Sequence, residues 1–257
     1  MRILNALVVS WGLFLAVPAA SAQTVTPPAD FQAFSVTDMF EDSEPQSIPL
    51  VLVSDAAGAT VFSVTGLSLL DAVSGGSFGV SEDYSLTLWI APRPGYAITR
   101  YELSGTLTAQ MQPGIPGPGA FNIRDGFASN NSEFGIYGPA TGNVQINNVN
   151  GIQTFDVTVP GGGDVAPRFA IDMWGMVHAN GAYTRYNYYD ESGNLQEHKV
   201  PPLSNVAASD VRFTVYWEVV PVPEPATWAL LLGGLLPLAA AGWSSRRARP
   251  VRSNARL

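Results

Sequence analysis

Apolar and polar residues alternate with a period of two through much of residues 23–224, and no stretch there sustains the 3.6-residue period of an amphipathic helix. The segment 84–90 places four apolar side chains on one face and Ser85, Thr87 and Trp89 on the other, as a half-buried strand does. After the turn at 91–95 the pattern returns, which predicts that these two strands form a hairpin. The same alternation marks residues 153–159, 168–177 and 211–220.

Strands with one apolar face must cover that face by packing two sheets together or by closing a barrel. We therefore predict an all-β fold, an antiparallel β-sandwich or jelly-roll-like body, over residues 23–220. The Gly- and Pro-rich stretches 112–119 and 160–163 are typical of surface loops, and no fixed-period repeat points to a solenoid or propeller. Residues 23–45 are less strand-like and are expected to form a loose N-terminal arm.

Residues 1–22 have the order of a secretory signal peptide. Arg2 precedes an apolar run, and Ala20-Ser21-Ala22 supplies the small residues of a cleavage site. The run is shorter than the ~20 residues of a membrane span, although an N-terminal anchor is the alternative. The sequence predicts export, with Gln23 as the mature N-terminus.

Residues 226–243 form an uncharged apolar segment about as long as a bilayer core, which predicts a single transmembrane helix. Two tryptophans bracket the segment and five arginines follow it, in the arrangement of interfacial anchors and a positive-inside flank. We therefore expect the body outside and an Arg-rich cytoplasmic tail, 244–257. The flanking residues in question are Trp228, Trp243, Arg246, Arg247 and Arg249.

The charge of the body limits its partners. Residues 23–224 carry 21 acidic and 7 basic side chains, a net charge of −14. Such a body repels phosphate backbones, so nucleic-acid binding is not expected. The chain has no cysteine, which excludes disulfides, thiolate metal sites and cysteine nucleophiles.

Pro223, Glu224 and Pro225 stand directly before the apolar segment, where the prolines favour an extended backbone. The tail over residues 222–249 closely resembles the PEP-CTERM sorting signal of Gram-negative envelope and exopolysaccharide-associated proteins, a signature also known as the ice-binding protein C-terminal domain. The resemblance implies that an exosortase, a multi-pass membrane enzyme, is the partner and that these three residues are its recognition motif. Exosortases of this family use a cysteine, so this chain would be the substrate. An ordinary single-span anchor after a proline linker is the alternative.

Catalytic and metal patterns are weak in the body. Gly75–Gly79 matches the G-x-S-x-G elbow with Ser77 as nucleophile and His178 or His198 downstream, but an elbow needs a following helix and this segment leads into a strand. Neither histidine has a second histidine at ligand spacing. We expect no catalytic residue, no metal site and no cofactor. The alternative is a calcium site at an acidic cluster, namely Asp38, Glu41, Asp42 and Glu44.

Aromatic residues gather in the segment 183–190 more densely than an alternating strand needs. A tyrosine presents an apolar ring face and a polar edge, so this segment is a candidate for stacking on a sugar; ordinary sheet packing is the alternative. An ice-binding face would need a repeated Thr-x-Thr array, and Thr106-Leu107-Thr108 stands almost alone. The candidate sugar-stacking residues are Tyr183, Tyr186, Tyr188 and Tyr189.

Together these features predict a secreted cell-envelope or extracellular-matrix protein with a non-enzymatic body. It would pass through an inner-membrane-anchored intermediate before reaching the cell surface or the medium. An adhesin-like module that binds carbohydrate or calcium in an exopolysaccharide or biofilm matrix is the second hypothesis. A serine hydrolase at Ser77 is the third.

Overall fold

The computed structural model describes residues 23–41, 50–56, 58–75, 79–161 and 167–221. The chain divides into two units, Met1–Glu218 and Val219–Leu257, and the description that follows concerns the first. Its described residues form strands and one short 3-10 turn, η1 (Leu67–Leu69), with no α-helix. The expected signal peptide, transmembrane segment and Arg-rich tail lie outside the described residues.

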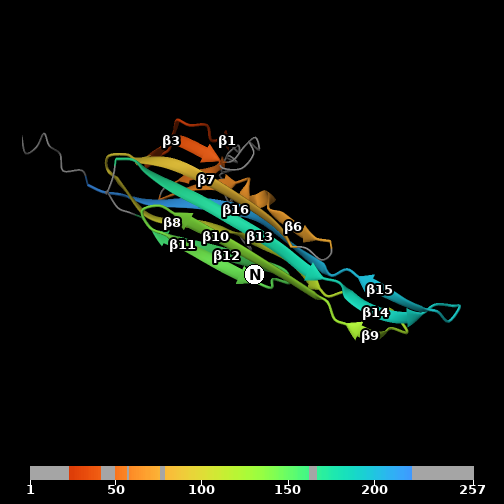
Figure 1. Cartoon of the computed structure of the whole chain (residues 1–257). Coiled ribbons are helices and arrows are strands. Elements are labelled where there is room, and N and C mark those ends of the chain that lie inside the picture. Colours follow the sequence, from red (N-terminus) through yellow and green to blue (C-terminus); the bar gives the residue numbers. More distant parts are fainter. Residues whose placement is uncertain (1–22, 42–49, 57, 76–78, 162–166, 222–257) are drawn as a thin grey trace, which may run out of the picture. The chain divides into compact units, whose positions relative to one another are not determined.

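Two large sheets make up most of this unit (Figure 1), and every strand pair with a described register is antiparallel. Sheet A contains, in spatial order, β1 (Gln23–Thr24), β4 (Leu50–Ala56), β5 (Ala59–Val64), β16 (Leu203–Val219), β8 (Tyr96–Gln112) and β12 (Gly151–Pro160), with β6 (Asp71–Ser74) also paired to β16. Sheet B contains β11 (Gly142–Asn147), β10 (Phe127–Tyr137), β13 (Phe169–Ala182), β7 (Val80–Pro92), β3 (Phe34–Glu41) and β2 (Ala29–Asp30).

The apolar faces of sheets A and B bury one another in a single core. Aromatic rings cross that core: Phe134 of β10 stacks on Phe155 of β12, with ring centroids 4.0 Å apart. Within sheet A, the ring of Phe213 on β16 stacks between those of Phe62 and Tyr101. The predicted all-β, antiparallel sandwich is therefore confirmed for the described residues.

The predicted hairpin between the strands at 84–90 and 100–108 is wrong. Strand β7 pairs with β3 and β13 in sheet B, whereas β8 lies between β16 and β12 in sheet A. The turn at Arg93–Gly95 thus carries the chain from one sheet to the other. Both strands have one strongly apolar face, and crossing between the sheets lets those two faces meet in the core instead of lying side by side.

The predicted loose N-terminal arm is also wrong for its described part. Strand β3 pairs with β7 over most of its length, and Phe34 is completely buried. Phe31 and Phe34 pack against each other and against Phe62 of β5 in edge-to-face or tilted contacts. Burial of these two rings offsets the weak strand propensity of the segment.

A third, smaller sheet continues from the ends of these strands. Sheet C consists of β15 (Leu195–Val200), β14 (Thr184–Tyr189) and β9 (Phe121–Arg124), in that order. Strand β14 follows β13 of sheet B directly, and β15 precedes β16 of sheet A. The small sheet is therefore continuous in the chain with a long strand of each large sheet (Figure 1). Sheet C carries most of the predicted sugar-stacking residues.

Candidate functional site

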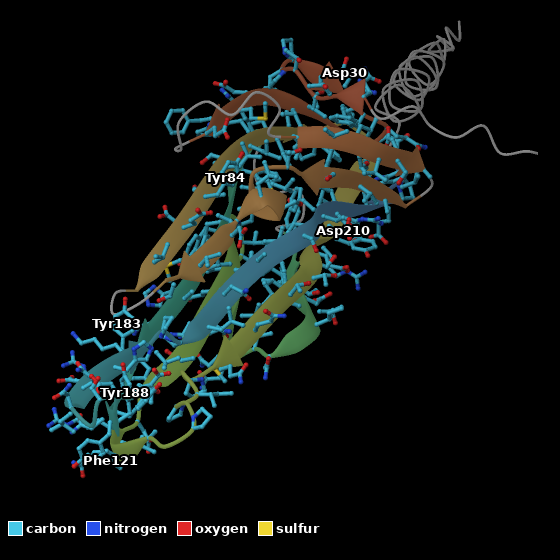
Figure 2. All side chains as sticks on the ribbon, turned by 90° about the vertical axis from the view of Figure 1, so that its right-hand side faces the viewer. Asp30, Tyr84, Phe121, Tyr183, Tyr188 and Asp210 are labelled. Atoms are coloured by element: carbon cyan, nitrogen blue, oxygen red, sulfur yellow. The ribbon has the colours of Figure 1, made fainter. Side chains whose placement is uncertain are left out.

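Sheet C separates the tyrosines that the sequence placed in one group. Because side chains alternate along a strand, Tyr186 and Tyr188 of β14 point to one face of the sheet and Tyr189 to the other. Tyr183 precedes the strand. Figure 2 shows Tyr188 and Phe121 at the same end of the sandwich, far from Asp30. The four tyrosines therefore do not form one continuous surface, and the two faces of sheet C have to be considered separately.

On the first face, Tyr186 is buried and contributes to packing. Its ring lies 5.5 Å from the imidazole of His198 and 6.2 Å from the ring of Tyr188. The loop before β9 closes over it: a Cβ added at Gly117 would lie 2.9 Å from the Tyr186 hydroxyl oxygen. Beside it, the buried Thr184 hydroxyl accepts a hydrogen bond from the Gly126 amide at 3.1 Å. Tyr186 is thus a structural residue, which corrects its assignment as an exposed sugar-stacking one.

On the second face, Tyr189 is 64% exposed and stacks on Phe121 of β9, with centroids 5.2 Å apart and planes 25° apart. One side of the tyrosine ring is covered by Phe121, and its high exposure leaves the rest accessible to a ligand. The stack connects β14 with β9 across the sheet. This face therefore keeps the stacking property that the sequence suggested.

The hairpin turn after Tyr189 is rigidified by Asp190. Its carboxylate accepts hydrogen bonds from the backbone amides of Asn194 and Ser192 at 2.8 and 3.0 Å, and from the Gln196 side chain at 3.0 Å. These bonds, that from the Asn194 amide most strongly, hold the pKa of Asp190 below its usual value. The turn fixes the end of β14 and with it the position of Tyr189.

Three cations lie in a row across the second face. Arg185 of β14 is the direct cross-strand partner of Lys199 on β15 and of Arg124 on β9, and cross-strand partners point to the same face. All three side chains are exposed. This row cannot be predicted from the sequence, because Arg124 and Arg185 are far apart in the chain and only the strand pairing brings them together.

A shallow pocket of about 370 Å³ opens beside the two arginines of the row. It is lined by Arg124 and Arg185, by polar groups of Asn122, Asn187 and Glu197, and by Ile123 and Tyr186. The positive backbone angle of Asn122 (φ 50°) marks the place where the β9–β14 pairing shifts register. The pocket combines guanidinium donors, amides and a nearby ring, which suits a polar ligand with an anionic group.

A second exposed aromatic surface lies on the outer face of sheet B. Phe40, Thr87, Asp172 and Tyr137 form one cross-strand row, and Tyr137 stacks on Trp174 with centroids 6.0 Å apart. The Asp172 carboxylate accepts hydrogen bonds from the hydroxyls of Ser85 and Thr87 at 3.0 and 3.3 Å. Alternation in the sequence already placed Ser85 and Thr87 outward. Sheet C, where a pocket of about 370 Å³ lies beside the cation row, is the better candidate site.

The weaker catalytic and metal hypotheses receive no support from the described residues. The chain after Gly79 enters strand β7 and not a helix, and Ser77 itself lies outside the described residues. His178 and His198 belong to different sheets. Within the described residues no group of three or more His, Asp or Glu side chains is arranged to hold a metal ion.

The calcium cluster is only partly described. Asp38 lies 3.7 Å from the guanidinium of Arg168, which itself covers the ring of Trp89. Glu41 ends strand β3, while Asp42 and Glu44 lie outside the described residues. Two of the four acids, Asp38 and Glu41, are thus described, both on β3.

The sorting motif and its flanks, Pro223 to Pro225 and the tryptophans and arginines that follow, also lie outside the described residues. In the part of the chain that the structure describes, no helix is long and apolar enough to cross a membrane. The tail predictions thus rest on the sequence.

The described residues define an all-β protein of the antiparallel sandwich class. No protein-family model matches the chain, and no curated protein matches it. Among solved structures, the carbohydrate-binding module TmCBM61, in complex with β-1,4-galactotriose, aligns with 78% of this chain and 100% of its own, at 9% sequence identity and a TM-score of 0.28. A likeness at that level defines neither a common fold nor a common function.

Proposed function

We propose that this protein is an exported envelope or extracellular-matrix protein whose tail is a sorting signal for an exosortase. The observation that carries the proposal is the order of features in residues 222–249: the Pro223-Glu224-Pro225 motif, an uncharged apolar segment and an arginine cluster. Residues 1–22 supply the matching export signal. The body would then work outside the cytoplasm, either held at the surface or released after processing.

Processing predicts a defined C-terminus. In the native host the mature protein is expected to end near Pro225, whereas a strain without its exosortase keeps the chain to Leu257. Replacing Pro223, Glu224 and Pro225 by alanine is expected to give the same retention of the tail, because the enzyme loses its recognition motif. Mass spectrometry of the C-terminal peptide measures each case.

Pro221→Ala is the matched control, since it alters the same proline-rich spacer outside the motif. It is expected to be processed as the parent is. An intact tail in the parent strain would rule out sorting and make the protein a permanently anchored one.

The second candidate function, binding of carbohydrate by the body, is favoured by the exposed stack of Tyr189 on Phe121 beside a polar pocket. A pyranose ring packs its apolar C–H face against an aromatic ring, while amides and charged groups take its hydroxyls. Binding of this kind needs no catalytic residue. It would connect the protein to the polysaccharide of the matrix in which it is proposed to reside.

Tyr189→Ala tests this function. We expect loss of most of the signal on a glycan array, at unchanged thermal stability, because the side chain is mostly exposed. Tyr137→Ala is the matched control, since it removes another exposed tyrosine, from sheet B, and is expected to keep binding. Equal signals from parent and Tyr189→Ala would exclude this face. Tyr186→Ala is unsuitable as a test, because loss of a buried ring would disturb sheet C itself.

A further inference from the structure

Among the seven basic residues of the body, Arg124, Arg185, Lys199 and Arg212 have no acidic partner among the described residues, and only the first three lie together. Arg93, Arg100 and Arg168 each lie 3.2–3.8 Å from a carboxylate. No carboxylate of the described residues lies within ion-pair distance of Arg124, Arg185 or Lys199. Acidic side chains are abundant in the body, which has three of them for each basic one. The three cations of sheet C are therefore unpaired because of their position.

This arrangement is unfavourable for the free protein. Like charges directly opposite one another on neighbouring strands destabilise a sheet, and here three occupy one row. Neighbouring strands lie ~4.8 Å apart, so the row extends across ~10 Å. An anion bound along the row would remove the repulsion and form charge-assisted hydrogen bonds, bidentate ones with the two guanidinium groups.

The segments of sheet C carry four acidic side chains beside the three cations, and only one of the four lines the pocket. Glu197 is the one carboxylate among the residues that line the pocket, and it stands opposite Asn187 in the next rung. Asp190 is engaged by the amides of its own turn. Asp125 and Glu191, the remaining acids of these segments, follow β9 and lie in the β14–β15 turn. The pocket wall formed by Arg124 and Arg185 thus faces a single carboxylate.

An aromatic platform stands next to the cations on the same face. Asn187 is the cross-strand partner of Phe121, and Phe121 stacks on the exposed Tyr189. The pocket is lined by both arginines and by Asn187, the cross-strand partner of Phe121. Neither stacked ring lines the pocket, so a ligand held by the guanidinium groups reaches the platform only where it extends past Asn187.

We propose that this face binds an acidic polysaccharide, with sugar-ring stacking on Tyr189 and uronate carboxylates held by Arg124, Arg185 and Lys199. The inference rests on the second candidate function and adds the chemical class of the glycan. A neutral glycan would leave the guanidinium groups without a partner, whereas a carboxylate-bearing one pairs with them. A chain of such sugars places carboxylates at regular intervals along a row of this length.

Other polyanions fit the site less well. Outside the segments of sheet C, residues 23–224 carry 17 acidic and only 4 basic side chains. A duplex or a membrane surface is broad, so it would approach that acidic body and be repelled. A single polysaccharide strand contacts sheet C alone.

The test compares two polymers with the same backbone and different charge. Full-length protein in detergent is titrated with polygalacturonate and with highly methyl-esterified pectin, whose carboxylates are blocked. The charge variant is the double substitution Arg124→Gln and Arg185→Gln. Arg212→Gln on β16 is the matched control, because it is exposed and makes no ion pair with the described residues. Double-stranded DNA serves as another polyanion.

Polygalacturonate is expected to bind at least about tenfold more tightly than the ester, with affinity falling as salt rises. The double variant should lose that difference and most of the salt dependence, whereas Arg212→Gln should keep both. The melting temperature of the double variant should equal or exceed that of the parent, because its two substitutions relieve repulsion between exposed side chains.

Each contrary result is distinguishable. Equal binding of acid and ester by parent and double variant, lost in Tyr189→Ala, would overturn the acidic class and keep carbohydrate binding. Binding of neither polymer would overturn the acidic class, and a blank glycan array would remove the second candidate function as well. DNA binding as tightly as polygalacturonate would replace the polysaccharide by polyanions in general.

Discussion

Phe134→Ala is expected to lower the free energy of unfolding by about 3–5 kcal/mol, the usual cost of deleting a fully buried phenylalanine ring. The ring of Phe134 stacks on Phe155 at 4.0 Å, and this contact joins the two large sheets. Phe134 also covers its cross-strand partner Gly175, where an added Cβ would lie 2.6 Å from the phenylalanine ring. Gly175 has no side chain with which to refill the space, so a cavity is expected to remain.

Phe127→Ala is the matched control, since it removes the same ring from the same strand at a position that is 49% exposed. We expect a change of no more than about 0.5 kcal/mol there. Urea unfolding followed by circular dichroism measures both variants. Similar losses in the two would mean that the Phe134–Phe155 contact does not hold the sheets together.

Alkaline pH is expected to destabilise the fold steeply above pH 10. Burial raises the pKa of Tyr101 well above its usual value, and burial together with the Glu41 carboxylate does the same for Tyr84. Above about pH 10 the unfolded chain releases both phenol protons while the folded protein retains them, so unfolding becomes more favourable. The stabilisation is complete below pH 10 and falls by about 1.4 kcal/mol per pH unit for each tyrosine.

Tyr101→Phe isolates one of these two contributions. The ring and its stacking on Phe213 are kept, and the lost hydroxyl is buried without a hydrogen-bond partner among the described residues. At pH 7 the variant is therefore expected to be as stable as the parent or about 1 kcal/mol more stable. Between pH 10 and 11.5 its stability should fall about half as steeply. Tyr137→Phe, which removes an exposed hydroxyl, is the control, and an unchanged slope in Tyr101→Phe would contradict the assignment.

Much of the body was predictable from local pattern. The inward residues of β7, such as Leu86 and Leu88, and those of β16, such as Phe213 and Val215, follow directly from period-two alternation, and all four are completely buried. Alternation predicts which face of a strand is apolar. It does not predict which strand is the neighbour in the sheet, so the predicted hairpin between β7 and β8 was wrong.

The candidate site was predictable only in part. The density of tyrosines after residue 182 drew attention to β14, and Tyr189 does lie exposed beside a pocket. The same pattern gave no sign that loop residues near Gly117 would cover Tyr186. It also gave no sign of the cation row, because Lys199, Arg185 and Arg124 become neighbours only through two strand pairings.

By itself, the sequence determined the β class of the body, the inward face of most long strands and the predicted export and sorting signals at its ends. These properties depend on neighbouring residues: side-chain alternation, and the contiguous apolar segments that a membrane requires. The tertiary structure alone decided which strands pair, which tyrosine is accessible and where unpaired positive charge collects. Those properties depend on contacts between residues distant in the chain, and such contacts are selected by burial of the whole core.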